Sequence, residues 1–66
     1  MNLGKNIKKY RLKADLSRDK MAFRCNGQFT SLHLMRVEQG KIKNPGIYLV
    51  KAIADALRVS VDDLLK

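Results

Sequence analysis

The single cysteine, Cys25, and the single histidine, His33, are the two side chains that could form a catalytic pair. A thiol nucleophile needs a base that a third group orients, and neither a partner carboxylate nor an oxyanion loop accompanies this pair. Cys25 also falls on the apolar face of an expected helix, where a buried thiol is inert. We therefore expect no enzymatic activity and no small-molecule substrate. We interpret His33 as a phosphate contact or a bystander.

The cysteine and histidine content also limits structural sites. One cysteine cannot form an internal disulfide, and one cysteine with one histidine cannot complete a four-ligand zinc site. We expect no metal and no cofactor. A chain of 66 residues must then be held together by apolar packing alone.

Basic residues are concentrated in the first two-thirds of the chain. The net charge is +8; residues 1–43 hold eleven Lys or Arg against three acidic residues, whereas residues 44–66 hold three of each kind. A basic face beside a neutral remainder suits a polyanion, because each neutralised phosphate releases condensed counterions. The alternative is a solvated basic surface that only aids solubility.

Apolar residues recur at helical spacing along the whole chain, and no long stretch alternates with the period of two typical of a strand. We predict a compact all-α fold of five short helices in one domain over residues 1–66. The first helix covers about residues 3–13. The second begins after Ser17, whose hydroxyl can cap it, and stops at Asn26-Gly27, because these residues easily adopt left-handed dihedrals.

Three further helices are expected. Thr30 caps the third, which covers about residues 31–39. Asn44 and Pro45 are the expected N-cap and first residue of the fourth, because proline loses no hydrogen bond there. Ser60 caps the last. The residues expected to face the core from the last two helices are Ile47, Val50, Ile53, Ala54, Leu57, Val61, Leu64 and Leu65.

The chain contains no segment that approaches the ~20 apolar residues of a membrane span. Its first residues also lack the apolar run of a targeting segment. We therefore expect a soluble, cytoplasmic protein with no membrane partner.

Four short motifs occur in order along the chain: Leu16-Ser17, Met21-Ala22, Val37-Glu38-Gln39-Gly40-Lys41 and Asn44-Pro45. A fifth, IADALRVSVDDLL, follows at residues 53–65. In this order they resemble the lambda-repressor-like helix-turn-helix family of phage repressors and Cro proteins, and the resemblance covers nearly the whole chain. It implies that the second helix lies across the DNA backbone and that the third, about residues 30–39, enters the major groove.

The resemblance also implies which residues contact DNA. The base-reading positions are Thr30, Ser31, Leu32 and Arg36. Arg36 would donate two parallel hydrogen bonds to a guanine; its alternative is a phosphate contact or a solvated arginine. The phosphate-contacting positions, at the start of the second helix and beyond the third, are Ser17, Arg18, Gln39, Lys41 and Lys43. Arg11 and Glu38 match two positions that form an ion pair in the family, joining the first helix to the end of the third.

Three features depart from the family pattern. The stretch between Ala22 and Val37 is two residues longer than usual, and we place the extra length at Asn26-Gly27-Gln28. Leu32 and Met35 occupy outward positions of the third helix that are more often polar, which would suit thymine methyl groups and would equally suit a protein partner. Gly46 stands where some members carry an arginine that reaches the minor groove, so we expect no such contact.

The sequence therefore predicts a sequence-specific transcriptional regulator that binds double-stranded DNA. We expect a homodimer, because one short helix reads too few bases alone. The alternative is a protein-interaction module on the same fold that docks a partner on the Leu32/Met35 face. Tyr10 and Tyr48 are interpreted as packing at the core edge, since a base-stacking surface needs several aromatic residues together.

Overall fold

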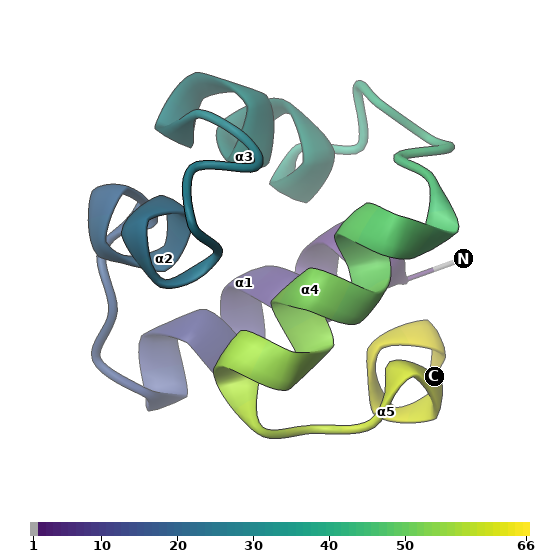
Figure 1. The fold of residues 1–66 in the computed structure, drawn as a ribbon. Coiled ribbons are helices and arrows are strands. Elements are labelled where there is room, and N and C mark those ends of the chain that lie inside the picture. The colour runs from purple at the N-terminus through teal and green to yellow at the C-terminus, as the bar shows by residue number, and fades with distance from the viewer. Residues whose placement is uncertain (1) are drawn as a thin grey trace.

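The structure, a computed structural model, describes residues 2–66. These residues form five α-helices and no strand: α1 (Leu3–Lys13), α2 (Arg18–Arg24), α3 (Ser31–Glu38), α4 (Ile47–Leu57) and α5 (Val61–Leu65). The prediction of a compact all-α chain is confirmed. α1 and α4 cross the middle of the molecule, with α2 and α3 on one side of them and α5 on the other (Figure 1). None of the helices in this part of the chain has the length and apolar character needed to cross a membrane.

Hydroxyl side chains begin three of the helices, as the sequence predicts. Ser17 Oγ and Thr30 Oγ1 each accept a hydrogen bond of 3.1 Å from a first-turn backbone N–H, in α2 and α3 respectively. In α5, Ser60 Oγ accepts from the Asp63 N–H at 3.0 Å, and the Asp63 carboxylate accepts from the Ser60 N–H at 3.1 Å. This second bond lowers the pKa of Asp63. Each cap satisfies a backbone donor that has no partner within its helix.

α2 and α3 both stop at residues with positive φ. Asn26 and Gly27 have φ values of 58° and 70°, so the predicted stop at this dipeptide is confirmed. α3 ends at Glu38, one residue before the predicted end, with Gln39 as its C-cap and Gly40 at a φ of 78°. Positive φ ends a right-handed helix, and glycine adopts it without steric cost.

α4 begins later than predicted. Asn44 and Pro45, expected as the N-cap and first helical residue, lie in the preceding loop, and Ile47 is the first residue of the helix. Gly46 has a φ of 92° and a ψ of 144°. A right-handed helix cannot contain this backbone conformation, so the helical run starts only after Gly46.

Three apolar side chains are more exposed than predicted. Ile47 lies on the same helical face as Val50 but is 64% exposed, and it lines an open hollow of about 200 Å³ that residues of α1 and α5 also border. Tyr48 is 86% exposed, and Leu65 is 41% exposed. Neighbouring residues on a helix point about 100° apart, so Leu65 cannot share the inward direction of Leu64. The exposed apolar residues at these two helices are available for contact with other molecules.

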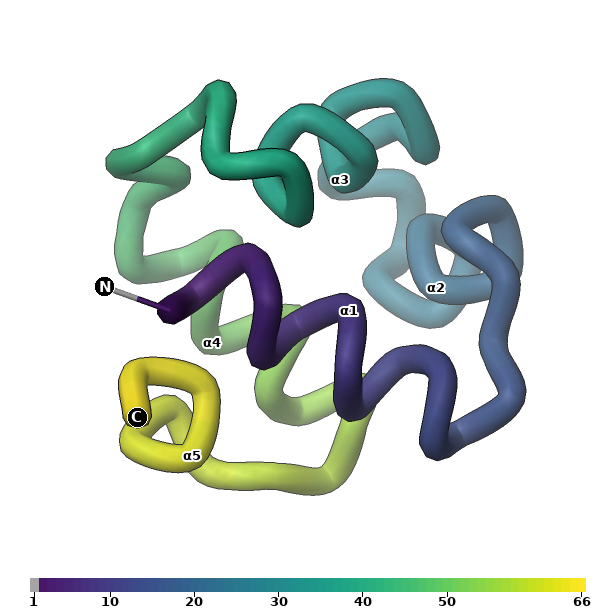
Figure 2. The backbone as a smooth tube through the Cα atoms, turned by 180° about the vertical axis from the view of Figure 1, so that it is seen from behind, coloured from purple at the N-terminus to yellow at the C-terminus, as the bar shows by residue number. Residues whose placement is uncertain are grey.

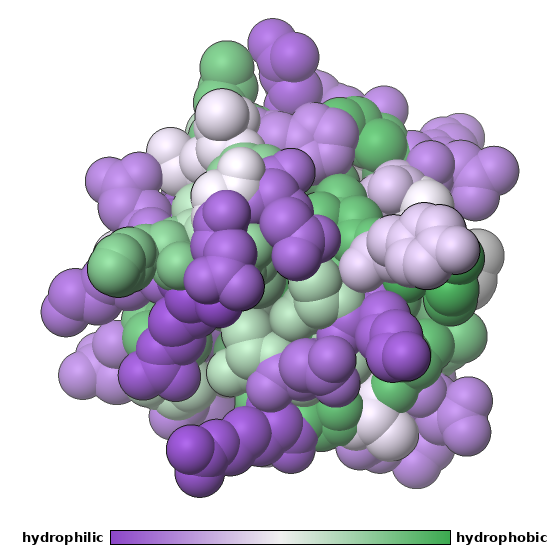
Figure 3. Space-filling model, in the orientation of Figure 1, coloured by the Kyte–Doolittle hydropathy of each residue, from purple (hydrophilic) through white to green (hydrophobic). Residues whose placement is uncertain are grey.

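All five helices contribute to one apolar core. The largest fully buried side chains include one from each helix: Ile7, Met21, Leu34, Ile53 and Leu64. The other buried apolar residues surround them: Leu3, Leu16, Cys25, Phe29, Val37, Val50 and Ala54. On the outside, hydrophilic side chains cover much of the visible face and hydrophobic ones form separate patches (Figure 3). Truncating a fully buried aliphatic side chain to alanine costs about 2–5 kcal/mol, so this core supplies most of the stability.

The first turn of α1 packs directly on the backbone of α3. A Cβ added to Gly4 would lie 2.8 Å from the Glu38 carbonyl oxygen and closer still to that of Val37. Only glycine allows the two backbones to approach this closely. In the same turn of α1, Asn6 Nδ2 donates to the Leu64 carbonyl oxygen at 2.9 Å, which ties α5 to this part of α1 (Figure 2).

The buried carboxylate of Glu38 joins the first three helices. It accepts from Arg11 Nε at 2.7 Å and Arg11 Nη2 at 3.2 Å, and from Arg18 Nε at 3.0 Å. Arg11 Nη1 donates to the Leu16 carbonyl oxygen at 2.8 Å. Arg11 is 5% exposed and Glu38 is 7% exposed, so the ion pair implied by the resemblance is present and almost removed from water.

We predict that Gly4→Ala destabilises the protein. Alanine in a helix usually gains up to about 1 kcal/mol over glycine, but here the overpacking against α3 costs roughly 1–3 kcal/mol. Urea unfolding followed by circular dichroism measures the change. Lys5→Ala, at an exposed position of the same helix, is the control and should shift the free energy of unfolding by less than about 0.5 kcal/mol. A stabilised Gly4→Ala variant would show that α1 and α3 can separate at no cost.

We predict that Glu38→Gln lowers the free energy of unfolding by more than Gly4→Ala does. It leaves the buried Arg11 charge without a counter-charge, and breaking one side of a buried pair costs about 3–5 kcal/mol. A domain of this size has only about 3–10 kcal/mol in total, so thermal unfolding should show a large drop in Tm. Asp55→Asn, an exposed position on α4, is the matched control. If Glu38→Gln lowered the free energy of unfolding by less than about 1 kcal/mol, hydrogen bonds to the Leu16 carbonyl and to water would be enough to stabilise the Arg11 charge.

Candidate functional site

Residues 25–30 connect α2 to α3 and determine where α3 lies. The Gly27 N–H donates to the Ala22 carbonyl oxygen at 3.1 Å, which closes the end of α2. Cys25 and Phe29 are buried in the core near the two ends of the connection, whereas residues 26–28 between them are exposed. Residues 26–28, where we expected the extra length, therefore lie on the surface, and the buried side chains on either side hold the connection in place.

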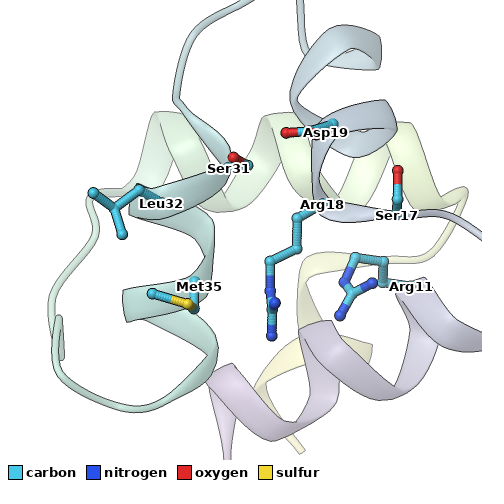
Figure 4. A pocket seen from close by; sticks show the side chains of 7 residues that line it. All are labelled: Arg11, Ser17, Arg18, Asp19, Ser31, Leu32 and Met35. Atoms are coloured by element: carbon cyan, nitrogen blue, oxygen red, sulfur yellow. The ribbon is translucent and has the colours of Figure 1, made fainter.

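An open hollow of about 470 Å³ lies between the start of α2 and the outer side of α3 (Figure 4). Residues from α1, α2 and α3, with the residue that caps α2, line it: Arg11, Ser17, Arg18, Asp19, Ser31, Leu32 and Met35. In Figure 4, Leu32 and Met35 project from α3, and the Arg18 side chain lies between that helix and Arg11. The hollow thus combines the apolar side chains of Leu32 and Met35 on one wall with cationic and hydroxyl side chains, and the carboxylate of Asp19, on the other.

α3 presents one face to the core and the other to solvent. Its buried residues are Leu34, Val37 and Glu38. On the opposite face, Arg36 is exposed and Leu32 is half-exposed. Ser31 and Met35 are partly buried on the side that lines the hollow. Three of the four predicted base-reading residues therefore lie on one helix with their side chains outside the core.

The fourth predicted base-reading residue, Thr30, has a structural role. It lies just before α3, is exposed, and its Oγ1 accepts the capping bond from the His33 N–H at 3.1 Å. The hydroxyl proton is still available for donation, because a hydroxyl can accept and donate at once. Thr30 can therefore cap α3 and contact a ligand at the same time.

Arg18 is less free than the sequence suggests. We predicted a phosphate contact, but its Nε donates to Glu38 and its side chain is only 33% exposed. Spacing gives no sign of this contact, because the two residues lie twenty positions apart. The guanidinium has five N–H donors, of which this bond uses one. Arg18 is therefore held in a fixed position in the hollow with donors left for an anion.

The remaining predicted phosphate residues lie at two separate places. Ser17 is exposed at the start of α2, on the rim of the hollow. Gln39, Lys41 and Lys43 are exposed in the loop that follows α3. The Lys41 N–H donates to the Arg36 carbonyl oxygen at 2.9 Å, which fixes the start of this loop against the end of α3. Cationic or hydroxyl groups therefore flank α3 both beside its first turn and beyond its last.

The cysteine has no features of a nucleophile. Cys25 is buried, its Sγ lies 3.7 Å from the Ala52 carbonyl oxygen, and burial raises the pKa of its thiol. A raised pKa keeps the thiol protonated at neutral pH, which is the inert form. Within residues 2–66, no group of three or more His, Cys, Asp or Glu side chains lies close enough together to hold a metal ion.

The outer face of α3 and the hollow beside it thus offer hydrogen-bond donors, positive charge and exposed apolar area. The donors and cations can bind an anion, and the apolar side chains can recognise a complementary surface by contact. Comparison of the chain with protein-family models, with curated proteins and with solved structures found no match in any of the three.

Proposed function

We propose that this protein is a lambda-repressor-like helix-turn-helix domain that binds specific sequences of double-stranded DNA and regulates transcription. In this proposal α2 and α3 are the two helices of the motif, and α3 inserts into the major groove. The protein acts in the cytoplasm as a binding protein and not as an enzyme. The observation that carries the proposal is the outer face of α3, where Ser31, Leu32 and Arg36 lie together between two sets of groups that can bind phosphates.

Charge supports a polyanionic partner. All of the net charge of +8 lies in residues 1–43, which form α1, α2, α3 and the start of the loop after α3. Ser17 and Arg18 flank α3 on one side, and Lys41 and Lys43 follow it on the other. Phosphate contacts on both sides of a recognition helix would set its register in the groove.

The buried ion pair supports the fold assignment. Arg11 and Glu38 occupy positions that the resemblance pairs, and in this chain they form hydrogen bonds of 2.7 and 3.2 Å. The pair ties α3 to α1, which stabilises the helix that would enter the groove. The order of five short helices and the exposed outer face of α3 are also consistent with the family.

The apolar side chains of α3 favour one competing function. Leu32 is 50% exposed and Met35 lines the hollow beside it, so a protein partner could dock there. The salt dependence of the binding affinity distinguishes the two functions, because phosphate binding weakens steeply with added salt, whereas binding through an apolar interface changes little. Selection of bound sequences from a pool of random duplexes, followed by a salt titration on the selected site, tests the proposal. No enrichment of any sequence would contradict it.

We predict that Lys41→Ala and Lys43→Ala each weaken binding to all duplexes by about the same factor. Each should also reduce the slope of log K against log salt by about one unit, because one phosphate contact is lost. Fluorescence anisotropy at several salt concentrations measures the slope. Lys51→Ala removes the same charge from the exposed side of α4 and should leave the slope unchanged. If Lys41→Ala and Lys43→Ala kept the same slope as Lys51→Ala and the unmodified chain, residues 41 and 43 would not contact phosphates.

We predict that Arg36→Ala leaves the fold intact and relaxes the choice of one base pair. If Arg36 binds a guanine, the change costs roughly 1–3 kcal/mol on the preferred site and much less on non-specific DNA. Binding to every single-base variant of the selected site measures this effect. Arg24→Ala, at the last residue of α2, serves as the control and should keep the full base preference. An equal loss on every variant would make Arg36 a phosphate contact.

We predict that two copies bind each site, with contacts between copies from α4 and α5. Residues 44–66 carry no net charge, so two basic chains can approach through this end without strong repulsion. Tyr48→Ser should weaken pairing on DNA, because it removes a largely exposed aromatic side chain; Phe23→Ser, on α2, is the matched control. Sedimentation of the complex measures the stoichiometry. One chain per selected duplex would contradict the dimer.

A further inference from the structure

Leu32 and Met35 form an apolar pair on the basic outer face of α3. Both line the hollow between α2 and α3, and neither belongs to the core cluster. Leu32 is 50% exposed, although removing its side chain from water would be favourable. An apolar pair that projects from the middle of a candidate binding face points to a ligand that also has an apolar part.

The pair lies between two arginines. Residues on a helix are about 100° apart, so Arg36 projects about 40° to one side of Leu32 and Met35 about 60° to the other. Met35 is on the side that faces α2, where the guanidinium of Arg18 lies in the same hollow. Leu32 therefore occupies the centre of the outward face, with a cation on each flank.

We propose that Leu32 and Met35 read the C5-methyl groups of thymines in the major groove. This inference rests on the proposed function and names the feature of the DNA that the site prefers. Thymine is the only unmodified DNA base that presents a methyl group in the major groove, and aliphatic side chains recognise it by apolar contact. The preferred site then contains thymine opposite the start of α3.

Charge complementarity favours DNA over a protein as the occupant. A protein partner would need a protruding apolar side chain surrounded by acidic groups, to match Leu32 and Met35 between Arg18 and Arg36. Duplex DNA supplies both features, because thymine methyl groups lie on the floor of a major groove that phosphates line on both sides. The apolar pair meets the groove floor while the flanking cations remain within reach of phosphates or guanines.

Replacement of thymine by uracil isolates the methyl group. The two bases present the same hydrogen-bonding atoms in the groove, so only the apolar contact differs. Burial of one methyl group changes an equilibrium constant by about fourfold. Each thymine of the selected duplex is replaced singly by deoxyuridine, and binding of the full chain is measured at constant salt by fluorescence anisotropy.

The expected result is a loss of about fourfold at one or two thymines and none at the others. In Leu32→Asn or Met35→Gln, the affinities for the thymine and uracil duplexes should become nearly equal at those positions. Leu12→Asn is the matched control, because Leu12 is exposed to a similar degree, 58%, but lies on α1. This variant should keep the full thymine preference. Both α3 variants change side chains outside the core, so circular dichroism should show folded protein.

Each other outcome overturns the inference. Equal binding to all thymine and uracil duplexes, with the sequence preference retained, refutes methyl reading and leaves the proposed function standing. If the thymine preference persists in both α3 variants, it arises from DNA shape or from other residues. Binding that selects no duplex and ignores salt removes the proposed function together with the inference, and then the Leu32/Met35 face is a protein-docking site.

Discussion

The buried ion pair between Glu38 and Arg11 determines how α3 is placed against α1. It lies almost out of water and joins α1 to the last turn of α3, and Arg18 adds α2 to the same carboxylate. Such a pair adds little net stability compared with apolar packing, but it cannot lose one member without leaving a buried charge. Its main effect is on geometry, because it specifies one position for α3 relative to α1.

Close packing at Gly4 completes this constraint. The backbone of α1 contacts the carbonyl groups of Val37 and Glu38, so the end of α3 is held by a steric contact as well as by charge. The start of α3 is held by Phe29, which is buried in the core just before it, and Thr30 caps the helix. A short helix fixed at both ends can present an outer face with defined directions, which base reading requires.

The same carboxylate connects stability to the candidate site. Arg18 donates to Glu38 from inside the hollow, so its guanidinium is oriented before any ligand binds. Ordering a free arginine side chain on binding would cost conformational entropy, and a prior contact reduces that cost. The hollow beside α3 is thus a preorganised surface, with Leu32 and Met35 on one wall and Arg18 on the other.

The helical class, the three hydroxyl caps, the stop at Asn26-Gly27 and the burial of Val50, Ile53, Ala54 and Leu64 follow from the sequence pattern, because they depend on periodicity and local hydrogen bonds. The resemblance supplied the Arg11–Glu38 pair. Glycine permits a positive φ without requiring one, so the folded structure was needed to place the start of α4 after Gly46. It also showed the exposure of Ile47 and the contact of Arg18 with Glu38. These features depend on which elements pack together and on residues far apart in the chain, and neither leaves a local pattern in the sequence.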